Sequence, residues 1–504
     1  MENRLQVERE TAGRGHPESP VGVDRLPNEI LRLIFTIAHD SETHLGDQPC
    51  FQSVYEEGCV LPAITQVSQR WRSIVLGTPR LWTRIGLMEE STTRMFLSRS
   101  KDALLDISFF PPTHSTSLPT FLEPLIPYSH RWRSLECIAG LDFPLAIVTV
   151  AVPRLETLRL KASKSLVHTF YQPVESLTLT GGPIFNKSPS LCELELDGIY
   201  IPPTHAIYTG LKTLRLVGMR VASLEIIGFL SDLQSCSLLE VLRLDRVVLG
   251  AGHVGGSWPG GSINFPRLRE IHIIRLDAAV IRDILSLISV PPTAKVVVES
   301  EDWGECTLRE IAPLSMPFDN ITQHIMRIQH LRCTATACTA HFKGYATADD
   351  KGPVLLEMIF APRIHVAPIG SRALQTVFQV LPLAGLASVH FDSITKLRTV
   401  SMVQALEKLP FVKRLVFSAC RAPYVRRLTI TPTRHLCPAL ERLEILSVDI
   451  TYEDLVDLVE SRSTRSSSEG LGGLRSMHVE RCPGLGETAV LSTFADVVDV
   501  SFVA

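Results

Sequence analysis

The chain has 504 residues, of which 45% are hydrophobic and 20% are charged, and its formal net charge is -3. This composition is typical of a folded protein and shows no global charge bias toward nucleic acid or an anionic membrane. Because 504 residues are several times a typical domain, we expect several cores or one elongated repeat array, not a single compact domain.

The N-terminal residues 1–22 are polar, and we expect a disordered tail there because they contain few apolar anchors. They lack the basic stretch and apolar run of a secretory signal, and no segment approaches the roughly 20 apolar residues of a membrane-spanning helix. The eleven cysteines are scattered and form no C-x-x-C pair, which favours a reducing compartment. These features predict a cytoplasmic or nuclear protein without a membrane or nucleic-acid partner.

The first strongly patterned segment runs from Leu26 to Ala38 and predicts a helix. Pro27 suits the first helical position, where its missing N–H costs nothing, and Glu29 complements the positive end of the helix. The apolar side chains cover an arc of about 200°, roughly twice what an ordinary surface helix needs. Either the rest of the chain or a partner protein must cover the surplus.

A second helix is predicted over residues 67–75, where the apolar side chains again fall on one face. Gly77 and Pro79 end it, and Leu81 and Trp82 bring an apolar pair back to its base. The interval 39–60 is polar and rich in turn-forming residues, so it is interpreted as a surface loop inserted between helices, which chain entropy tolerates well.

Together these segments resemble the F-box, and the ending Thr78-Pro79-Arg80-Leu81-Trp82 is similar to the variant abundant in mushroom-forming fungi. The resemblance covers residues 26–87 and implies a helical module at 23–90 that binds a Skp-type adaptor, itself linked to a cullin. The residues that this resemblance assigns to adaptor binding are Leu26, Pro27, Ile30, Leu31, Ile34, Phe35, Trp71, Leu81 and Trp82.

Beyond the module, residues 91–504 repeat a pattern of apolar, two residues, apolar, one residue, apolar. Successive copies start, for example, 19 residues apart (155 and 174), 20 apart (191 and 211) and 28 apart (211 and 239, and 412 and 440), in or near the range of leucine-rich repeats. Such units are stable only when stacked, so an α/β array is expected, an irregular solenoid with one strand per repeat. The first positions of the copies are Leu155, Val174, Leu191, Leu211, Leu239, Leu268, Leu386, Val412, Leu440 and Leu474, with a poorer copy at Trp132.

The array is predicted to be irregular in two respects. Residues 294–385 contain strand-like segments at 295–299 and 354–360, a turn at 348–352 and a helix near 373–381, but no clean repeat anchor. The Asn or Cys that usually follows the last apolar position is present only as Cys420 and Cys482, so the polar ladder is largely missing. Residues 253–261 and 461–473 look like solvent loops.

Strand positions between the last two apolar anchors are expected to face outward, on the side of the sheet without helices. They are interpreted either as an ordinary solvated face or as the contact surface for an acidic or phosphorylated protein segment. Arg159, Arg215, Arg243 and His272 are the candidate substrate-binding residues, and the last three form a modest cationic patch. The full set is Arg159, Thr178, Glu195, Arg215, Arg243, His272, His390, Glu444 and His478.

No cofactor, metal site or catalytic residue is predicted. The chain has no phosphate-binding loop, zinc-binding H-E-x-x-H helix or G-x-S-x-G nucleophile turn. One group of potential metal ligands lacks the spacing of structural zinc sites, and half-buried strand residues explain it adequately. Its members are His324, His330, Cys333, Cys338 and His341.

Two functions remain open from the sequence. The resemblance implies a non-catalytic substrate receptor of a Skp/cullin/F-box-type ubiquitin ligase, which holds an unidentified protein substrate on the repeat array. The alternative is a leucine-rich-repeat interaction scaffold in which the N-terminal helices only cap the array. The two readings differ in whether the first helix leaves an exposed apolar surface.

Overall fold

The computed structural model describes residues 23–41, 60–110, 117–139, 150–162, 177–178, 188–250, 262–300, 319–336, 339–361, 369–469, 473–486, 490, 494 and 498–503. The chain divides into two compact units, residues 1–138 with 150–155, and residues 139–149 with 156–504. The first unit therefore holds the predicted helical module and the elements that follow it as far as residue 138.

The first unit combines a helical module with three short parallel strands, in which β2 pairs with both β1 and β3. The helix predicted over 26–38 is present as α1 and continues through Ser41, so the predicted loop at 39–60 starts too early; residues 42–59 lie outside the described residues. The elements are η1 (Val23–Arg25), α1 (Asn28–Ser41), α2 (Val60–Val67), α3 (Gln69–Leu76), η2 (Pro79–Trp82), β1 (Arg84–Ile85), α4 (Glu90–Ser100), β2 (Leu105–Phe109), α5 (Leu118–Leu122), η3 (Ile126–Arg131) and β3 (Trp132–Ala139).

The sequence does not predict α2, and the helix predicted over 67–75 is present as α3, which begins at Gln69 because the chain breaks at Ser68 between the two helices. Ser68 has an extended backbone, and its side-chain oxygen accepts a hydrogen bond from the Trp71 N–H at 3.1 Å. This satisfies one of the free N–H groups at the start of α3 and makes Ser68 its N-cap.

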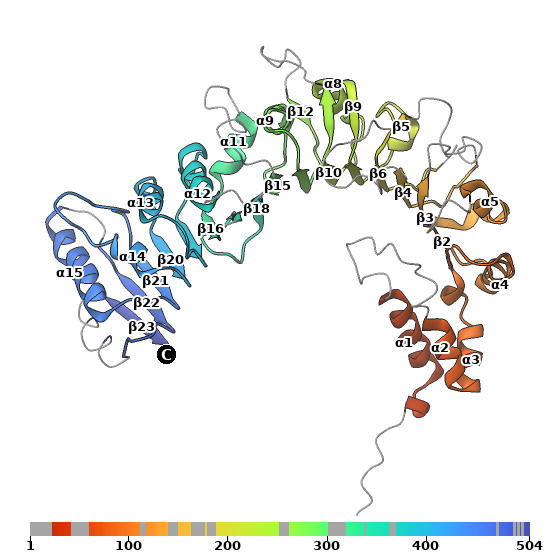
Figure 1. Cartoon of the computed structure of the whole chain (residues 1–504), viewed down its shortest axis with the longest axis horizontal. Helices are drawn as coiled ribbons and strands as arrows, with labels where there is room; N and C mark the ends of the chain where they lie inside the picture. The colour runs from red at the N-terminus through yellow and green to blue at the C-terminus, as the bar shows by residue number, and fades with distance from the viewer. Residues whose placement is uncertain are drawn as a thin grey trace, which may run out of the picture. The chain divides into compact units, whose positions relative to one another are not determined.

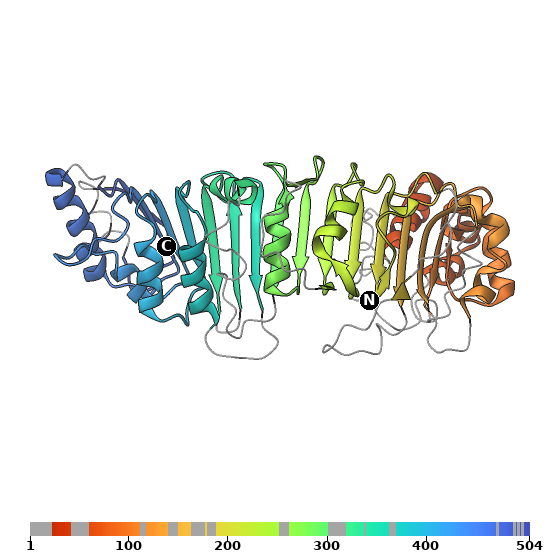
Figure 2. The ribbon, with the colours of Figure 1, turned by 90° about the horizontal axis from the view of Figure 1, so that it is seen from above.

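The second unit is a mixed α/β array whose strands are mostly parallel, with helices on one face of the sheet (Figure 1). Seen from above, the helices lie in front of strands that run side by side (Figure 2). The helices among the described residues are η4 (Ala206–Tyr208), α8 (Ile226–Leu233), α9 (Ala278–Leu287), α11 (Asp319–Met326), α12 (Ile369–Val380), α13 (Thr399–Glu407), α14 (Ala422–Arg426) and α15 (Tyr452–Glu469).

The main sheet of the second unit pairs its strands in the order β4, β6, β8, β10, β13, β15, β18, β17, β16, β19, β20, β21, β22, β23. Its strands are β4 (Thr157–Ala162), β6 (Glu193–Asp197), β8 (Thr213–Val217), β10 (Val241–Asp245), β13 (Glu270–Ile274), β15 (Lys295–Ser300), β16 (His330–Ala335), β17 (Ala340–Tyr345), β18 (Val354–Phe360), β19 (Ser388–Asp392), β20 (Arg414–Ser418), β21 (Arg442–Leu446), β22 (Ser476–Glu480) and β23 (Asp499–Val503).

Short parallel pairs accompany this sheet: β5 (Leu177–Thr178) with β7 (Ile199–Tyr200), β9 (Arg220–Glu225) with β11 (Val248–Gly250), and β12 (Ile263–Asn264) with β14 (Ile288–Ser289). The repeat predicted at Val174 is therefore wrong as a strand of the main sheet. Thr178 belongs to a separate pair, and β4 pairs directly with β6.

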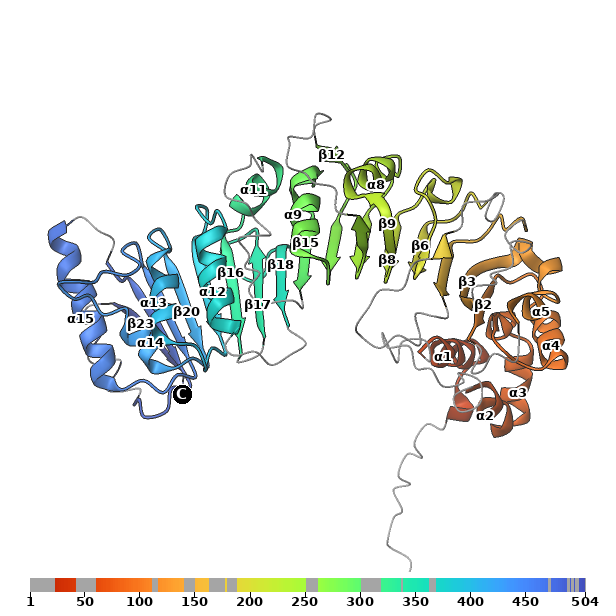
Figure 3. The same cartoon turned by 45° about the horizontal axis from the view of Figure 1, so that its top comes forward.

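Residues 294–385 lack a repeat anchor because the chain forms an antiparallel meander there. β16, β17 and β18 follow one another in sequence, but their order across the sheet is the reverse of their order in the chain. β18 therefore pairs with β15, and β16 pairs with β19. Figure 3 shows them side by side in this order. β17 is antiparallel to both of its neighbours and is joined to them without intervening helices, so the strand-then-helix alternation of the repeat pattern is interrupted here.

The predicted repeat anchors that are described point into the core. In every described copy of the main sheet, from Leu155 to Leu474, the three anchor side chains are at most 5% exposed. The polar ladder survives at two places, where the Cys420 thiol donates to the Phe391 carbonyl at 3.3 Å and the Cys482 thiol donates to the Ile445 carbonyl at 3.6 Å. The sequence pattern therefore predicts correctly which side chains are buried.

A left-handed residue follows eight of the strands. Its N–H donates to a carbonyl at the end of the neighbouring strand in the sheet, as from Ala419 to Leu446 at 2.8 Å. The acceptor is the last residue of that strand in seven cases and the next-to-last, Glu299, for Arg275. This backbone bond links neighbouring strand ends whether or not a cysteine of the side-chain ladder follows. Only two of these positions are glycine; the set is Gly198, Gly218, Arg246, Arg275, Ser393, Ala419, Ser447 and Arg481.

We predict that Ala419→Gly stabilises the second unit by about 1 kcal/mol, because glycine adopts a φ of 50° without the steric cost that alanine pays. Ala279→Gly, at an exposed position in α9, is the matched control and is expected to destabilise by about 0.5–1 kcal/mol. Chemical denaturation measures both. A loss of stability in Ala419→Gly contradicts the strain argument.

One predicted loop is wrong in its first part. Residues 461–469 belong to α15, and Arg462 is only 4% exposed. Its guanidinium donates to the carbonyls of Leu428, Leu436 and Cys437, at 2.7, 2.8 and 3.3 Å respectively, so it satisfies polar groups that a sequence pattern does not reveal. The predicted tail at 1–22 and the predicted loop at 253–261 lie outside the described residues.

Candidate functional site

The apolar arc of α1 is divided between the module's core and its surface. Leu31 and Phe35 are 0% and 1% exposed, and the Phe35 ring lies 4.8 Å from the Trp71 ring of α3, centroid to centroid. Both side chains are one turn apart on the same face of the helix. They anchor α1 inside the module.

The other half of the arc is exposed. Ile30 and Ile34 are each 42% exposed, and Leu33 and Ile37 are each 55% exposed. Their spacing of three, four and seven residues places all four on one face, which we call the α1 stripe. A continuous apolar face on a helix whose opposite side is already packed is a typical feature of a protein-binding surface.

The structure changes the set of candidate adaptor-binding residues. Leu31, Phe35, Leu81 and Trp82 are internal, so they shape the module and offer no surface, whereas Leu33 and Ile37 belong to the exposed face and were not assigned to it from sequence. Trp82 is held by a hydrogen bond from its Nε1 to the Val75 carbonyl, 2.9 Å, and by an edge contact with Phe96. The remaining candidates divide as follows: Pro27, Ile30 and Ile34 are exposed, and Leu26 and Trp71 are half-buried.

Hydrogen bonds hold α1 at its N-terminal end. The Arg70 guanidinium of α3 donates to the Asn28 side-chain oxygen at 2.9 Å and to the Leu26 carbonyl. These bonds connect the start of α1 to α3 and place Ile30 and Ile34 beside a fixed helix end.

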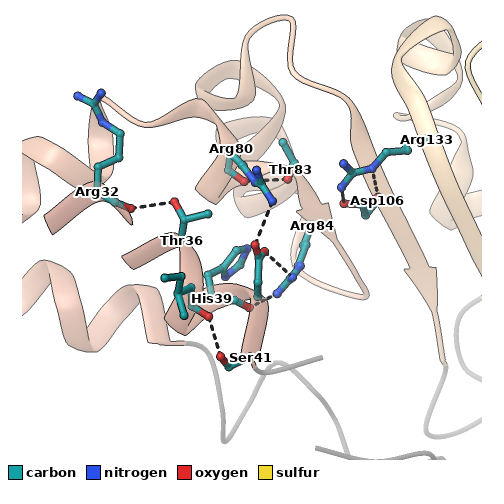
Figure 4. A network of polar contacts seen from close by, with 11 residues as sticks. Arg32, Thr36, His39, Ser41, Arg80, Thr83, Arg84, Asp106 and Arg133 are labelled. Carbon is teal, nitrogen blue, oxygen red and sulfur yellow. Dashed lines mark hydrogen bonds and ion pairs between the residues drawn. The ribbon is translucent and has the colours of Figure 1, made fainter. Parts of the chain in front are cut away.

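A second polar network holds the C-terminal end of α1 (Figure 4). The Asp40 carboxylate accepts from Arg80 of η2 and from Arg84 of β1, each at 3.0 Å, and Arg84 also donates to the His39 carbonyl. The His39 ring is 4% exposed; its burial, with a smaller contribution from Arg84, lowers its pKa to about 4. The imidazole is therefore neutral at physiological pH.

The face of the second unit opposite the helices carries the candidate substrate-binding residues. Register places Arg159, Glu195, Arg215, Arg243 and His272 in one row across β4, β6, β8, β10 and β13. The expected adjacency of Arg215, Arg243 and His272 is confirmed. We call this row the central row.

The basic side chains of the central row lie beside carboxylates on the same face. Glu193 lies within ion-pair distance of both Arg159 and Arg215, Asp245 lies 3.4 Å from Arg243, and Glu270 lies 3.0 Å from His272. The sequence pattern predicted the cations but not these partners, which come from flanking rows. An acidic ligand would have to compete with these carboxylates for the guanidinium groups.

The described members of the predicted histidine and cysteine group do not converge. His324 contacts the Leu355 carbonyl at 3.2 Å, His330 contacts the Ser388 hydroxyl at 3.0 Å, and His341 contacts the Glu357 carboxylate at 2.8 Å. Cys333 is fully buried, and Cys338 lies outside the described residues. Within the part of the chain that the structure describes, no three His, Cys, Asp or Glu side chains are arranged to hold a metal ion.

Comparisons with known proteins returned no match, either to a protein-family model or to a curated protein. Among the described residues, no helix combines the length and the apolar character that a membrane span requires.

Proposed function

We propose that the protein is the substrate-receptor subunit of a Skp/cullin/F-box-type ubiquitin ligase and that the α1 stripe is its adaptor-docking surface. The observation that carries the proposal is the exposure of Ile30, Leu33, Ile34 and Ile37 on a helix whose other face is packed. The resemblance of the sequence around Pro27, Pro79 and Trp82 to the F-box supports the choice of partner.

The second unit is proposed to be a leucine-rich-repeat-like solenoid that holds a protein substrate. Buried anchors at repeat spacing, parallel strands and helices confined to one face support this assignment. The receptor itself performs no chemistry in this proposal. It raises the effective concentration of substrate lysines beside the ubiquitin-conjugating enzyme, in the cytoplasm or the nucleus.

Binding of the purified full chain to a purified Skp-type adaptor, measured by calorimetry, tests the proposal. We expect a 1:1 complex whose formation buries apolar surface and so has a negative heat-capacity change. If the folded wild-type chain binds no Skp-type adaptor, the ligase proposal fails and the scaffold alternative takes its place.

The central row leads to a prediction about substrate binding by the second unit. Arg215→Gln with Arg243→Gln is expected to leave adaptor affinity unchanged and to weaken acidic substrates about tenfold, because two charge-assisted hydrogen bonds are lost. Glutamine is preferable to glutamate here because Glu193 and Asp245 already lie beside these positions. Retention of substrates identified with the wild-type chain is quantified by mass spectrometry.

Arg269→Gln is the matched control, since this arginine is 77% exposed and pairs with Glu240 outside the strands. It is expected to retain the same substrates as the wild type. Equal retention by the double variant and the control would contradict a substrate role for the central row.

A further inference from the structure

The two ends of α1 are held in different ways. Its apolar anchors, Leu31 and Phe35, lie in the first two turns, where Arg70 also attaches the helix to α3. The last turn directly follows Ile37 of the stripe and ends at Ser41. Residues 42–59 then separate it in sequence from α2, so the short covalent link that usually fixes a helix end to its neighbour is absent.

The polar network at Asp40, Arg80 and Arg84, which we call the Asp40 clamp, takes the place of that link. Arg84 donates to the His39 carbonyl, one of the last four carbonyls of α1 that have no partner within the helix. The same guanidinium pairs with Asp40, and its positive charge lies at the negative end of the helix dipole. Arg84 therefore caps α1 from a different element.

The clamp also connects α1 to the strands of the first unit. Arg84 belongs to β1, and its Cα partner in β2 is Asp106, whose carboxylate forms a two-bond ion pair with Arg133 of β3. Figure 4 shows these groups in sequence from α1 to β3. The last turn of α1 is thereby held in place by contacts with a sheet, which is more rigid than a loop.

We propose that the Asp40 clamp is a positioning element for adaptor docking: it fixes the last turn of α1, and with it the neighbouring Ile37, against η2 and β1. The proposal rests on the proposed function for the identity of the partner. Asp40, Arg80 and Arg84 act through the helix, and the apolar stripe makes the contact. Without the clamp, only the fraction of molecules with a correctly placed last turn can dock.

Asp40→Asn tests the proposal, because the amide keeps the shape of the side chain but loses the charge that holds both arginines. Adaptor affinity is expected to fall about fivefold, as two half-exposed ion pairs are lost and the competent fraction decreases. Asp40→Glu keeps the charge and is expected to restore most of the affinity. Glu90→Gln, which removes the exposed Glu90–Arg94 pair of α4 in the same unit, is the control and should leave it unchanged.

A second measurement tests, in the absence of the adaptor, whether the last turn of α1 is held in one position. Spin labels attached through unnatural amino acids at Ser41 and Lys101, both exposed, should give a narrow distance distribution in the wild type and a broader one in Asp40→Asn. Wild-type affinity in Asp40→Asn, or an equal loss in Glu90→Gln, overturns the proposal. If the wild type binds no adaptor, the proposed function fails, and the distance distribution alone decides the positioning role: broadening supports it and an unchanged width overturns it.

Discussion

Leu33→Asp combined with Ile37→Asp is expected to abolish adaptor binding while the module stays folded. Both side chains are 55% exposed in the free protein, so the new carboxylates remain in water and cost the fold little. In the complex they would be buried without a partner, which costs several kcal/mol and lowers affinity by more than about a hundredfold. Calorimetric titration with the adaptor measures the loss.

The matched control lies on the other face of the same helix. Phe35→Ala removes a side chain that is 1% exposed and packs on Trp71, so it is expected to destabilise the module by about 3–5 kcal/mol. Melting followed by circular dichroism separates the two cases, since only Phe35→Ala should lower the transition strongly. Wild-type affinity in the folded Leu33→Asp/Ile37→Asp protein would show that the α1 stripe is not the docking surface.

Acidification from pH 6.5 to 4 is expected to destabilise the second unit through His330. The side chain is 1% exposed; burial, assisted by the nearby charge of Arg414, lowers its pKa from 6.5 to about 4. In this pH range the His330 imidazole is therefore protonated in the unfolded chain and neutral in the folded chain. The contribution of the neutral imidazole to the free energy of unfolding is complete above pH 6.5 and decreases as the pH falls. By pH 4 the loss of stability is on the order of 3 kcal/mol.

His330→Asn removes the titrating group and keeps an amide near the position of the imidazole Nδ1, which lies 3.0 Å from the Ser388 hydroxyl. Hydrogen exchange of the β16 amides should then depend less on pH than in the wild type. His39→Asn is the reciprocal control, because the pKa of His39 is also lowered to about 4 but its ring lies in the first unit. An unchanged pH dependence at β16 in His330→Asn would refute the assignment.

The sequence predicts the existence of α1 and the width of its apolar arc, but not which half is internal. That division depends on Trp71 of α3, which lies 36 residues after Phe35 and whose ring packs against it. Helical periodicity describes one helix at a time, so it gives the whole apolar arc without dividing it. The resemblance to the F-box then assigned Leu31 and Phe35 to adaptor binding and left out Leu33 and Ile37. Packing between elements decides the candidate site.

The repeat pattern predicts burial more reliably than it predicts pairing order. Anchors such as Leu214 and Leu415 are fully buried as expected, because apolar side chains that alternate along a strand gather on the face of the sheet that the rest of the chain covers. The meander of β16, β17 and β18 leaves no such signal, since antiparallel strands need only short turns between them. The left-handed residues Arg246 and Ala419 also carry no sequence signal, because glycine or asparagine is expected there.

The reversed order of the meander has a consequence during synthesis. β15 ends at Ser300, but its sheet neighbour β18 is complete only at Phe360, 60 residues further along the chain. At roughly 5–20 residues per second, the nascent chain carries the Val296–Val298 segment on an unpaired strand edge for about 3 to 12 seconds. Such an edge is a template for pairing with other chains. This interval is when a ribosome-associated chaperone would protect the protein most.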